Sequence, residues 1–154
     1  YIKFYSSTPV EDIEAENNAV TSILDAESGA IVFKVLMKSF QFEKALMQEH
    51  FNDNYVESDK YPDATFKGSI EDFSTVNLSE DGTYPVTVSG EMTMHGVTQP
   101  VTAEGTVMVK DGKVSAASVF KLRPEDYDIR IPKAVRENIA EVLEITVELA
   151  YDAM

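Results

Sequence analysis

A regular alternation of apolar and polar side chains runs through the second half of the chain. It is clearest in residues 86–94, and it returns in residues 101–110, 114–122 and 142–151. A period of two is the pattern of a β-strand with one buried face. The Asp111-Gly112 pair between the second and third segments is a strong signal for a two-residue hairpin. Long consecutive antiparallel strands of this kind predict a tall meander or a barrel.

The first half of the chain is also mostly strand by its pattern. Two further segments are typical of short helices: residues 42–51, with an apolar side, and residues 132–140, where a proline stands in the first turn. There is no linker, repeat or low-complexity tract, so residues 1–154 are predicted to form a single all-β domain of about eight or nine strands. The strands expected in the first half are residues 1–6, 13–15, 19–24, 31–37 and 65–76.

Closing such a sheet into a barrel hides its two edges and turns the apolar face inward. An antiparallel barrel of eight strands is either filled by its own side chains or holds one small ligand. Gly90, Gly105 and Ala116 are small and fall on the inward faces of three consecutive strands, so they leave space inside. The alternative is that the helices, or Phe33 and Phe120 from opposite walls, fill that space.

The charge of the chain limits the classes of partner. Thirteen basic and 27 acidic residues give a formal net charge of −14. Nucleic-acid binding relies on clustered Lys and Arg, and docking on an anionic membrane needs the same, so neither partner is expected. The absence of cysteine excludes disulfides, thiolate metal sites and cysteine nucleophiles. No apolar run approaches the length of a membrane-spanning helix.

Four motifs of the chain resemble those of the YceI-like family. They are residues 50–52 (HFN), 60–66 (KYPDATF), 92–101 (MTMHGVTQPV) and 126–129 (DYDI), in the family's order and at similar spacing. The resemblance covers the whole chain. It implies a lipocalin-like, eight-stranded antiparallel β-barrel with one or two short helices capping an end. It also implies that a long polyisoprenoid or prenyl-quinone lipid binds inside the barrel.

Other properties also follow from the resemblance alone. Members are commonly exported to the periplasm, so we expect an exported protein whose signal peptide has been removed before Tyr1. Pairing of two copies into a homodimer is a further expectation of this kind. Residues 6–17 (SSTPVEDIEAEN) depart from the better-studied members, so the chain resembles a divergent sub-branch.

The candidate ligand contacts lie on the inward faces of the strands and on the first helix. A pyrophosphate head group would require basic side chains at the barrel mouth, which Arg123, Arg130 and Arg136 could supply. Ordinary surface charge beside a helix is the simpler explanation of these residues. The candidate contacts with the apolar chain are Phe33, Val35, Met37, Phe42, Leu46, Phe51, Gly90, Met92, Met94, Gly105, Val107, Ala116, Phe120, Tyr127, Ile145 and Val147.

The two histidines of the chain are the first candidates for catalysis or metal binding. Neither His50 nor His95 has a partner at metal-ligand spacing, and no catalytic constellation is evident, so no metal, cofactor or catalytic residue is expected. The expected function is non-enzymatic carriage or storage of an apolar lipid. Two alternatives stay open: an enzyme that uses His95 or a buried carboxylate on a lipid or small acid, and a filled barrel that acts as an interaction or stress-response module.

Overall fold

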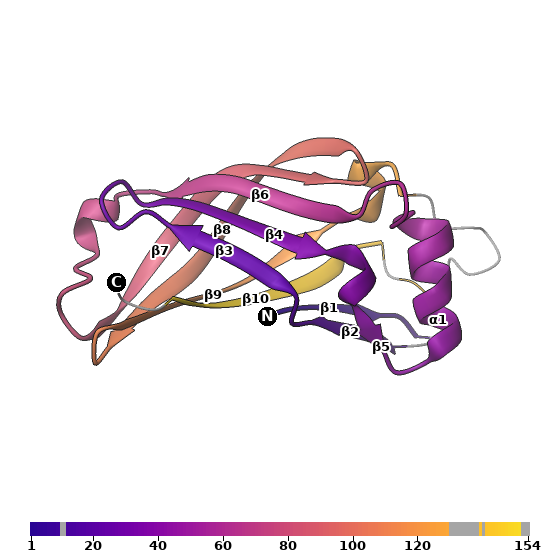
Figure 1. Cartoon of the computed structure of the whole chain (residues 1–154), viewed down its shortest axis with the longest axis horizontal. Helices are drawn as coiled ribbons and strands as arrows, with labels where there is room; N and C mark the ends of the chain where they lie inside the picture. Colours follow the sequence, from indigo (N-terminus) through magenta and orange to yellow (C-terminus); the bar gives the residue numbers. More distant parts are fainter. Residues whose placement is uncertain (10–11, 130–138, 140, 152–154) are drawn as a thin grey trace.

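The computed structural model describes residues 1–9, 12–129, 139 and 141–151. These residues form one antiparallel sheet of ten strands, curled into a half-barrel, with α1 standing across one end (Figure 1). The order in the sheet is β3-β4-β6-β7-β8-β9-β10-β1-β2-β5. The expected all-β, lipocalin-like fold is confirmed. The strands are β1 Ile2–Ser7, β2 Asp12–Asn17, β3 Val20–Leu24, β4 Ala30–Leu36, β5 Gln41–Phe42, β6 Asp63–Ile70, β7 Gly82–Met94, β8 Val97–Lys110, β9 Lys113–Leu122 and β10 Leu143–Tyr151.

Several elements differ in extent from the sequence prediction. There are ten strands rather than eight or nine, and they include the two-residue strand β5. The strand predicted over residues 65–76 ends at Ile70, because Asp72 takes a left-handed φ of 50° and starts the 3-10 helix η3 (Phe73–Thr75). The helix predicted over residues 42–51 is shorter: α1 spans Ala45–His50 and continues as the π-helix η2 (Phe51–Tyr55). The helix predicted over residues 132–140 lies outside the described residues apart from Ile139.

Two tight turns define the long meander. His95-Gly96, with φ of 56° and 74°, joins β7 to β8, and Asp111-Gly112, with φ of 51° and 79°, joins β8 to β9. Positive φ at both positions is the signature of the type I′ hairpin turn. The Asp111-Gly112 hairpin is therefore confirmed. The tight turn at His95 also starts β8 at Val97, four residues before the predicted residue 101.

The alternation of the sequence correctly predicts which side chains face the interior. Val107 is fully buried, and Met92 and Val147 are 6% and 5% exposed. The charged residues between them, Glu91, Glu104 and Glu148, are exposed. A slip of one residue would reverse this arrangement, so the apolar pattern fixes the register.

Glycine allows two neighbouring strands to approach closely where the sheet curls. Gly68 of β6 pairs with Gly90 of β7, and a Cβ atom added at Gly90 would lie 2.5 Å from the Cα of Gly68. From the sequence, Gly90 is predicted to leave empty space inside the barrel. The structure corrects that prediction, because the facing backbone occupies the space that the missing side chain leaves.

The two ends of the sheet are not paired with each other in the described part of the chain. Instead, the edge strand β3 approaches β10, which is the last strand of the chain and lies between β9 and β1 in the sheet. Ser22 Oγ and the Tyr151 hydroxyl form a hydrogen bond of 2.6 Å between them. Asn17, which is fully buried, holds the corner before β3 by donating from Nδ2 to the Leu36 carbonyl at 2.8 Å. The half-barrel is thus closed at this seam by side chains, and not by a backbone ladder.

Candidate functional site

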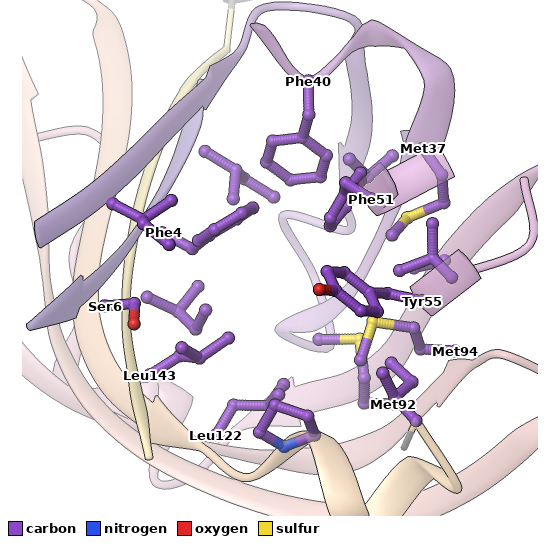
Figure 2. Close-up of a pocket in the computed structure, with 18 of the residues that line it drawn as sticks. Phe4, Ser6, Met37, Phe40, Phe51, Tyr55, Met92, Met94, Leu122 and Leu143 are labelled. Atoms are coloured by element: carbon purple, nitrogen blue, oxygen red, sulfur yellow. The ribbon is translucent and has the colours of Figure 1, made fainter. Parts of the chain in front are cut away.

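A cavity of about 120 Å³, which we call the upper cavity, lies inside the half-barrel beneath α1 and η2. Figure 2 shows its lining residues arranged around an open centre, with Phe4, Phe40 and Phe51 on one side and Met92, Met94 and Leu122 on another. The members of the lining come from both halves of the chain, so folding is required to assemble it. They are Ile2, Phe4, Ser6, Ile13, Phe33, Val35, Met37, Phe40, Phe42, Met47, Phe51, Tyr55, Val56, Ala64, Met92, Met94, Phe120, Leu122, Pro124, Ile129, Ile139, Leu143, Ile145 and Val147.

A cluster of phenylalanines covers the α1 end of this cavity. The ring of Phe4 lies 5.3 Å from Phe40, 5.5 Å from Phe42 and 5.5 Å from Phe51, measured between centroids. Phe51 also contacts Phe40 edge to face, with centroids 5.5 Å apart. Such contacts between rings stabilise beyond the burial of their area. The aromatic cluster therefore forms a firm cover rather than an open mouth.

A second cavity of about 60 Å³, which we call the lower compartment, lies deeper in the half-barrel, on the side away from α1. Gly105, Val107 and Ala116 are among the residues that line it. Phe33, Met92, Phe120 and Val147 line both cavities and form a layer between them. The interior is therefore partitioned, and the small side chains on β8 and β9 contribute to the lower compartment only.

Ser6 and Tyr55 are the polar members of the upper lining. The hydroxyl of Tyr55 points toward the centre of the pocket in Figure 2. Burial raises the pKa of Tyr55 above the ordinary tyrosine value of 10.0, so the phenol is neutral at physiological pH. A neutral hydroxyl inside an apolar cavity can hydrogen-bond a carbonyl or hydroxyl of a ligand.

Most of the predicted ligand contacts reach one of the two cavities. Three of them do not. Leu46 is 62% exposed on the outer side of α1, and Met47 takes the inward position, because the helix turns Leu46 away from the sheet. Gly90 is in backbone contact with β6 rather than at a cavity. Tyr127 is buried at 3% exposure, but it lies beside an outer groove and not in the lining of either cavity.

Of the three predicted head-group residues, Arg123 is the one that the structure describes. The Arg123 side chain is 53% exposed, and its Nη1 lies 3.7 Å from Glu125 Oε1. It lines an outer groove between β8 and β9. Arg130 and Arg136 lie outside the described residues.

His95 is held by hydrogen bonds at both ring nitrogens. Nδ1 lies 3.0 Å from the Tyr127 carbonyl oxygen and Nε2 lies 2.7 Å from Glu57 Oε2. The ring of Tyr61 meets the imidazole edge to face at 4.8 Å. These contacts connect the β7–β8 turn to the segment after η2 and to η4 (Pro124–Tyr127). His95 does not line either cavity, so its position fits a structural role.

The sequence pattern of the YceI-like domain matches residues 4–151. The chain belongs to the YceI-like family. A comparison with curated protein sequences gives no match.

Solved structures reproduce the YceI-like fold at low sequence identity. A polyisoprenoid-binding domain from Saccharophagus degradans, described as implicated in plant cell wall breakdown, has a TM-score of 0.86 at 15% identity over 99% of this chain and 93% of its own. BcnA of Burkholderia cenocepacia has a TM-score of 0.80 at 15% identity over 97% and 94%. The YceI protein of Campylobacter jejuni has a TM-score of 0.70 at 15% identity over 91% and 84%. These likenesses establish the shared fold.

Some lining residues of this YceI-like half-barrel were absent from the sequence prediction. Ile2, Phe4 and Ser6 alternate along β1 with outward residues, so the period of two already carried that signal. Phe40 and Tyr55, in contrast, belong to an aromatic group around the first helix (Phe40, Phe42, Phe51, Tyr55 and Tyr61) that the sequence itself marks as a possible wall or gate of the pocket. Both line the upper cavity, just after a 3-10 helix and in a π-helix respectively. Among the described residues there is no cluster of three or more side chains suited to a metal ion, and no helix long and apolar enough to cross a membrane.

Proposed function

We propose that this YceI-like protein binds a long apolar lipid of the polyisoprenoid or prenyl-quinone type inside the half-barrel and carries or stores it without covalent chemistry. The observation that supports this most directly is the upper cavity, because its lining is almost entirely apolar and includes a wall of aromatic rings. Transfer of apolar surface from water into such a site is favourable by about 25 cal/mol per Å². Affinity for an isoprenoid chain then comes from burial, and no reacting group is needed.

The position of His95 supports binding over catalysis. Both of its ring nitrogens have protein partners, and neither cavity is lined by it. A general base must reach the proton that it abstracts, and His95 reaches a carbonyl and a carboxylate of the protein instead. Export to the periplasm and pairing of two copies remain proposals that rest on membership of the family.

In the described part of the chain, the proposed contact with a charged head group is Arg123. Arg123 is the described member of the basic group, and it lines the groove between β8 and β9 rather than the upper cavity. An anionic head group would gain charge-assisted hydrogen bonds there, and a neutral one would not. An Arg123→Gln variant is therefore expected to weaken binding of geranylgeranyl pyrophosphate about tenfold and to leave geranylgeraniol unaffected.

A pair of tryptophan variants tests the proposed function. The chain has no tryptophan, so a single one is an unambiguous fluorescence reporter. Met47→Trp places the indole in the cavity lining, and Leu46→Trp places it on the exposed side of the same helix. Titration with geranylgeraniol is expected to change the emission of the first variant and not of the second. Mass spectrometry of organic extracts of the native protein should find a stoichiometric isoprenoid. No emission change together with a lipid-free extract would rule out the proposed function.

A further inference from the structure

The wall of the half-barrel has a gap between β8 and β9. These strands pair from Lys110↔Lys113 as far as Gly105↔Ser118, and the pairing stops there. Each strand nevertheless continues: residues 97–104 of β8 stay paired with β7, and residues 119–122 of β9 stay paired with β10. We call the space between residues 101–104 and residues 119–122 the window. At about 3.4 Å per residue, it is about 14 Å long.

The backbone groups along both sides of the window point across it. In a two-residue hairpin the flanking residues exchange both backbone hydrogen bonds, and such pairs alternate along the ladder. Lys110↔Lys113 flanks the turn, so the even-numbered residues of β8 direct their N–H and C=O groups toward β9. At the start of the window, Ser118 Oγ donates to the Glu104 carbonyl at 2.8 Å and so replaces a backbone partner.

Residues along these unpaired edges disfavour pairing with another strand. Pro100, just beyond the window, occupies an even position of β8, so no N–H points across the gap at that residue. On the opposite side, Lys121 lies along the window and Arg123 just beyond it, and both carry a positive charge. Proline and basic side chains are the usual devices by which an exposed strand edge avoids β-sheet association. The window is therefore unsuited to an inserted peptide strand.

The window leads into the ligand cavity. Outside it lies a groove of about 600 Å³, whose lining includes Val101, Thr102, Lys121 and Arg123. The floor of this groove contains Phe120 and Leu122, and both side chains also line the upper cavity. Phe120 and Leu122 thus lie between the groove and the upper cavity, and Val101 lies between the groove and the lower compartment. The far end of the window is closed by a hydrogen bond of 2.8 Å from Gln99 Nε2 to the Asp126 carbonyl.

The interior is too small for a long lipid unless part of the protein moves. Sites for drug-sized ligands usually measure about 300–1,000 Å³. The two cavities of about 120 and 60 Å³ are much smaller, so the wall or its side chains have to move when a long lipid enters. At the α1 end, movement would separate a packed aromatic cluster. At the window, it requires rotation of Phe120 and Leu122, and no backbone ladder has to break.

We propose that the window is a lateral portal, through which the apolar chain of the lipid passes into and out of the half-barrel while its head group stays in the groove beside Lys121 and Arg123. Phe120 acts as the gate. This inference rests on the proposed function, and it adds the route that the ligand takes. Because the lipid enters and leaves by the same route, blocking the portal should slow both uptake and release.

Two single-cysteine variants test the portal. The chain has no cysteine, so each variant can be modified at one position with a polyethylene glycol maleimide. Lys121→Cys places the polymer over the groove, and Lys113→Cys is the matched control, because it is also an exposed lysine of β9 but flanks the closed end of the ladder. Stopped-flow fluorescence with the anthraniloyl ester of geranylgeraniol gives the association and dissociation rates of each protein before and after modification.

Modification of Lys121→Cys is expected to lower both the association rate and the dissociation rate by about tenfold or more, while modified Lys113→Cys behaves like the unmodified protein. Equal rates for the two modified variants would overturn the portal. An unchanged association rate with a faster dissociation rate would also overturn it, because the groove would then contact the bound head group without lying on the route of entry. If the unmodified variants take up no ester and the Met47→Trp reporter is also silent, the proposed function itself fails, and the portal fails with it.

Discussion

His95 shows how one side chain can connect three separate parts of the fold. Its turn position has a positive φ, and its two ring nitrogens reach Tyr127 and Glu57. Glu57 follows η2, whose residues Phe51 and Tyr55 line the upper cavity. The imidazole therefore anchors the segment that covers the ligand site. Sequence reasoning placed His95 at a hairpin turn, but its partners lie 32 and 38 residues away, and no local pattern could identify them.

Replacing His95 should destabilise the protein without a direct effect on the cavity. His95→Asn keeps a residue that tolerates the left-handed conformation, so the loss reports on the two side-chain hydrogen bonds and not on the turn. We expect the free energy of unfolding to fall by about 1.5–3 kcal/mol, since one of these bonds is to a charged group. Urea denaturation measures it.

The other histidine provides the control for that experiment. His50 lies in α1 and outside the network. His50→Ala should change the free energy of unfolding by no more than about 0.5 kcal/mol. If His95→Asn is as stable as the unsubstituted protein, the network does not hold the cover in place.

At the scale of strands, close approach at glycine determines how tightly the sheet can curl. Gly68 and Gly90 face each other across β6 and β7, and an added Cβ at Gly68 would lie 2.9 Å from the Cα of Gly90. The obstacle is backbone on both sides, so it cannot move aside as a flexible side chain would. The curvature that creates an interior therefore depends on this pair.

Gly90→Ala is expected to lower the free energy of unfolding by about 1–3 kcal/mol, because the two strands must separate locally. Gly82→Ala is the matched control in the same strand. A Cβ there would meet Tyr84 at 3.4 Å, which is an ordinary contact, and the lost flexibility of the unfolded chain should make this change neutral or slightly stabilising. Thermal unfolding of both variants gives the comparison. Equal stability would show that the curl does not need the Gly68–Gly90 contact.

The alternation of apolar residues predicted the strands and their faces, but it could not predict where pairing stops. Residues 97–104 and 119–122 alternate as regularly as the paired parts of β8 and β9, because alternation reports which face is buried and not which neighbour is bonded. Pro100 was the one local sign of an open edge. The cavities were hidden for a similar reason, since the partition by Phe33, Met92, Phe120 and Val147 depends on side chains from four different strands.

At the scale of the whole molecule, the seam between β3 and β10 makes stability sensitive to alkaline pH. Burial raises the pKa of Tyr151 above 10.0, while its hydrogen bond with Ser22 acts in the opposite direction and is the smaller effect. The neutral phenol is thus favoured more in the folded protein than in the unfolded chain. The contribution of Tyr151 to the free energy of unfolding is fully present below pH 10.0, the ordinary pKa of tyrosine. It is lost as the pH rises through the raised pKa of Tyr151 in the folded protein.

Tyr151→Phe should therefore reduce the loss of stability above pH 10.0. Below that pH it should cost about 0.5–1.5 kcal/mol, because the bond to Ser22 is lost. Ser22→Ala separates the two effects: it removes the same bond but keeps the phenol, so its alkaline sensitivity should persist. Urea denaturation across the alkaline range provides the measurement. Identical pH profiles for Tyr151→Phe and the unsubstituted protein would contradict this account of the seam.

The adjacency of the first and last strands limits the order in which the protein can assemble. β1 lies between β2 and β10, with Ile2 opposite Val147, so nearly the whole chain separates these partners. The meander from β7 to β10, by contrast, is made of neighbours in sequence, and most of its pairs close only short loops. Closing a long loop costs more chain entropy than closing a short one, and contacts between distant residues slow folding. We therefore expect the β1–β10 ladder to form late, and the apolar inner face of the meander to be exposed to neighbouring chains until it does.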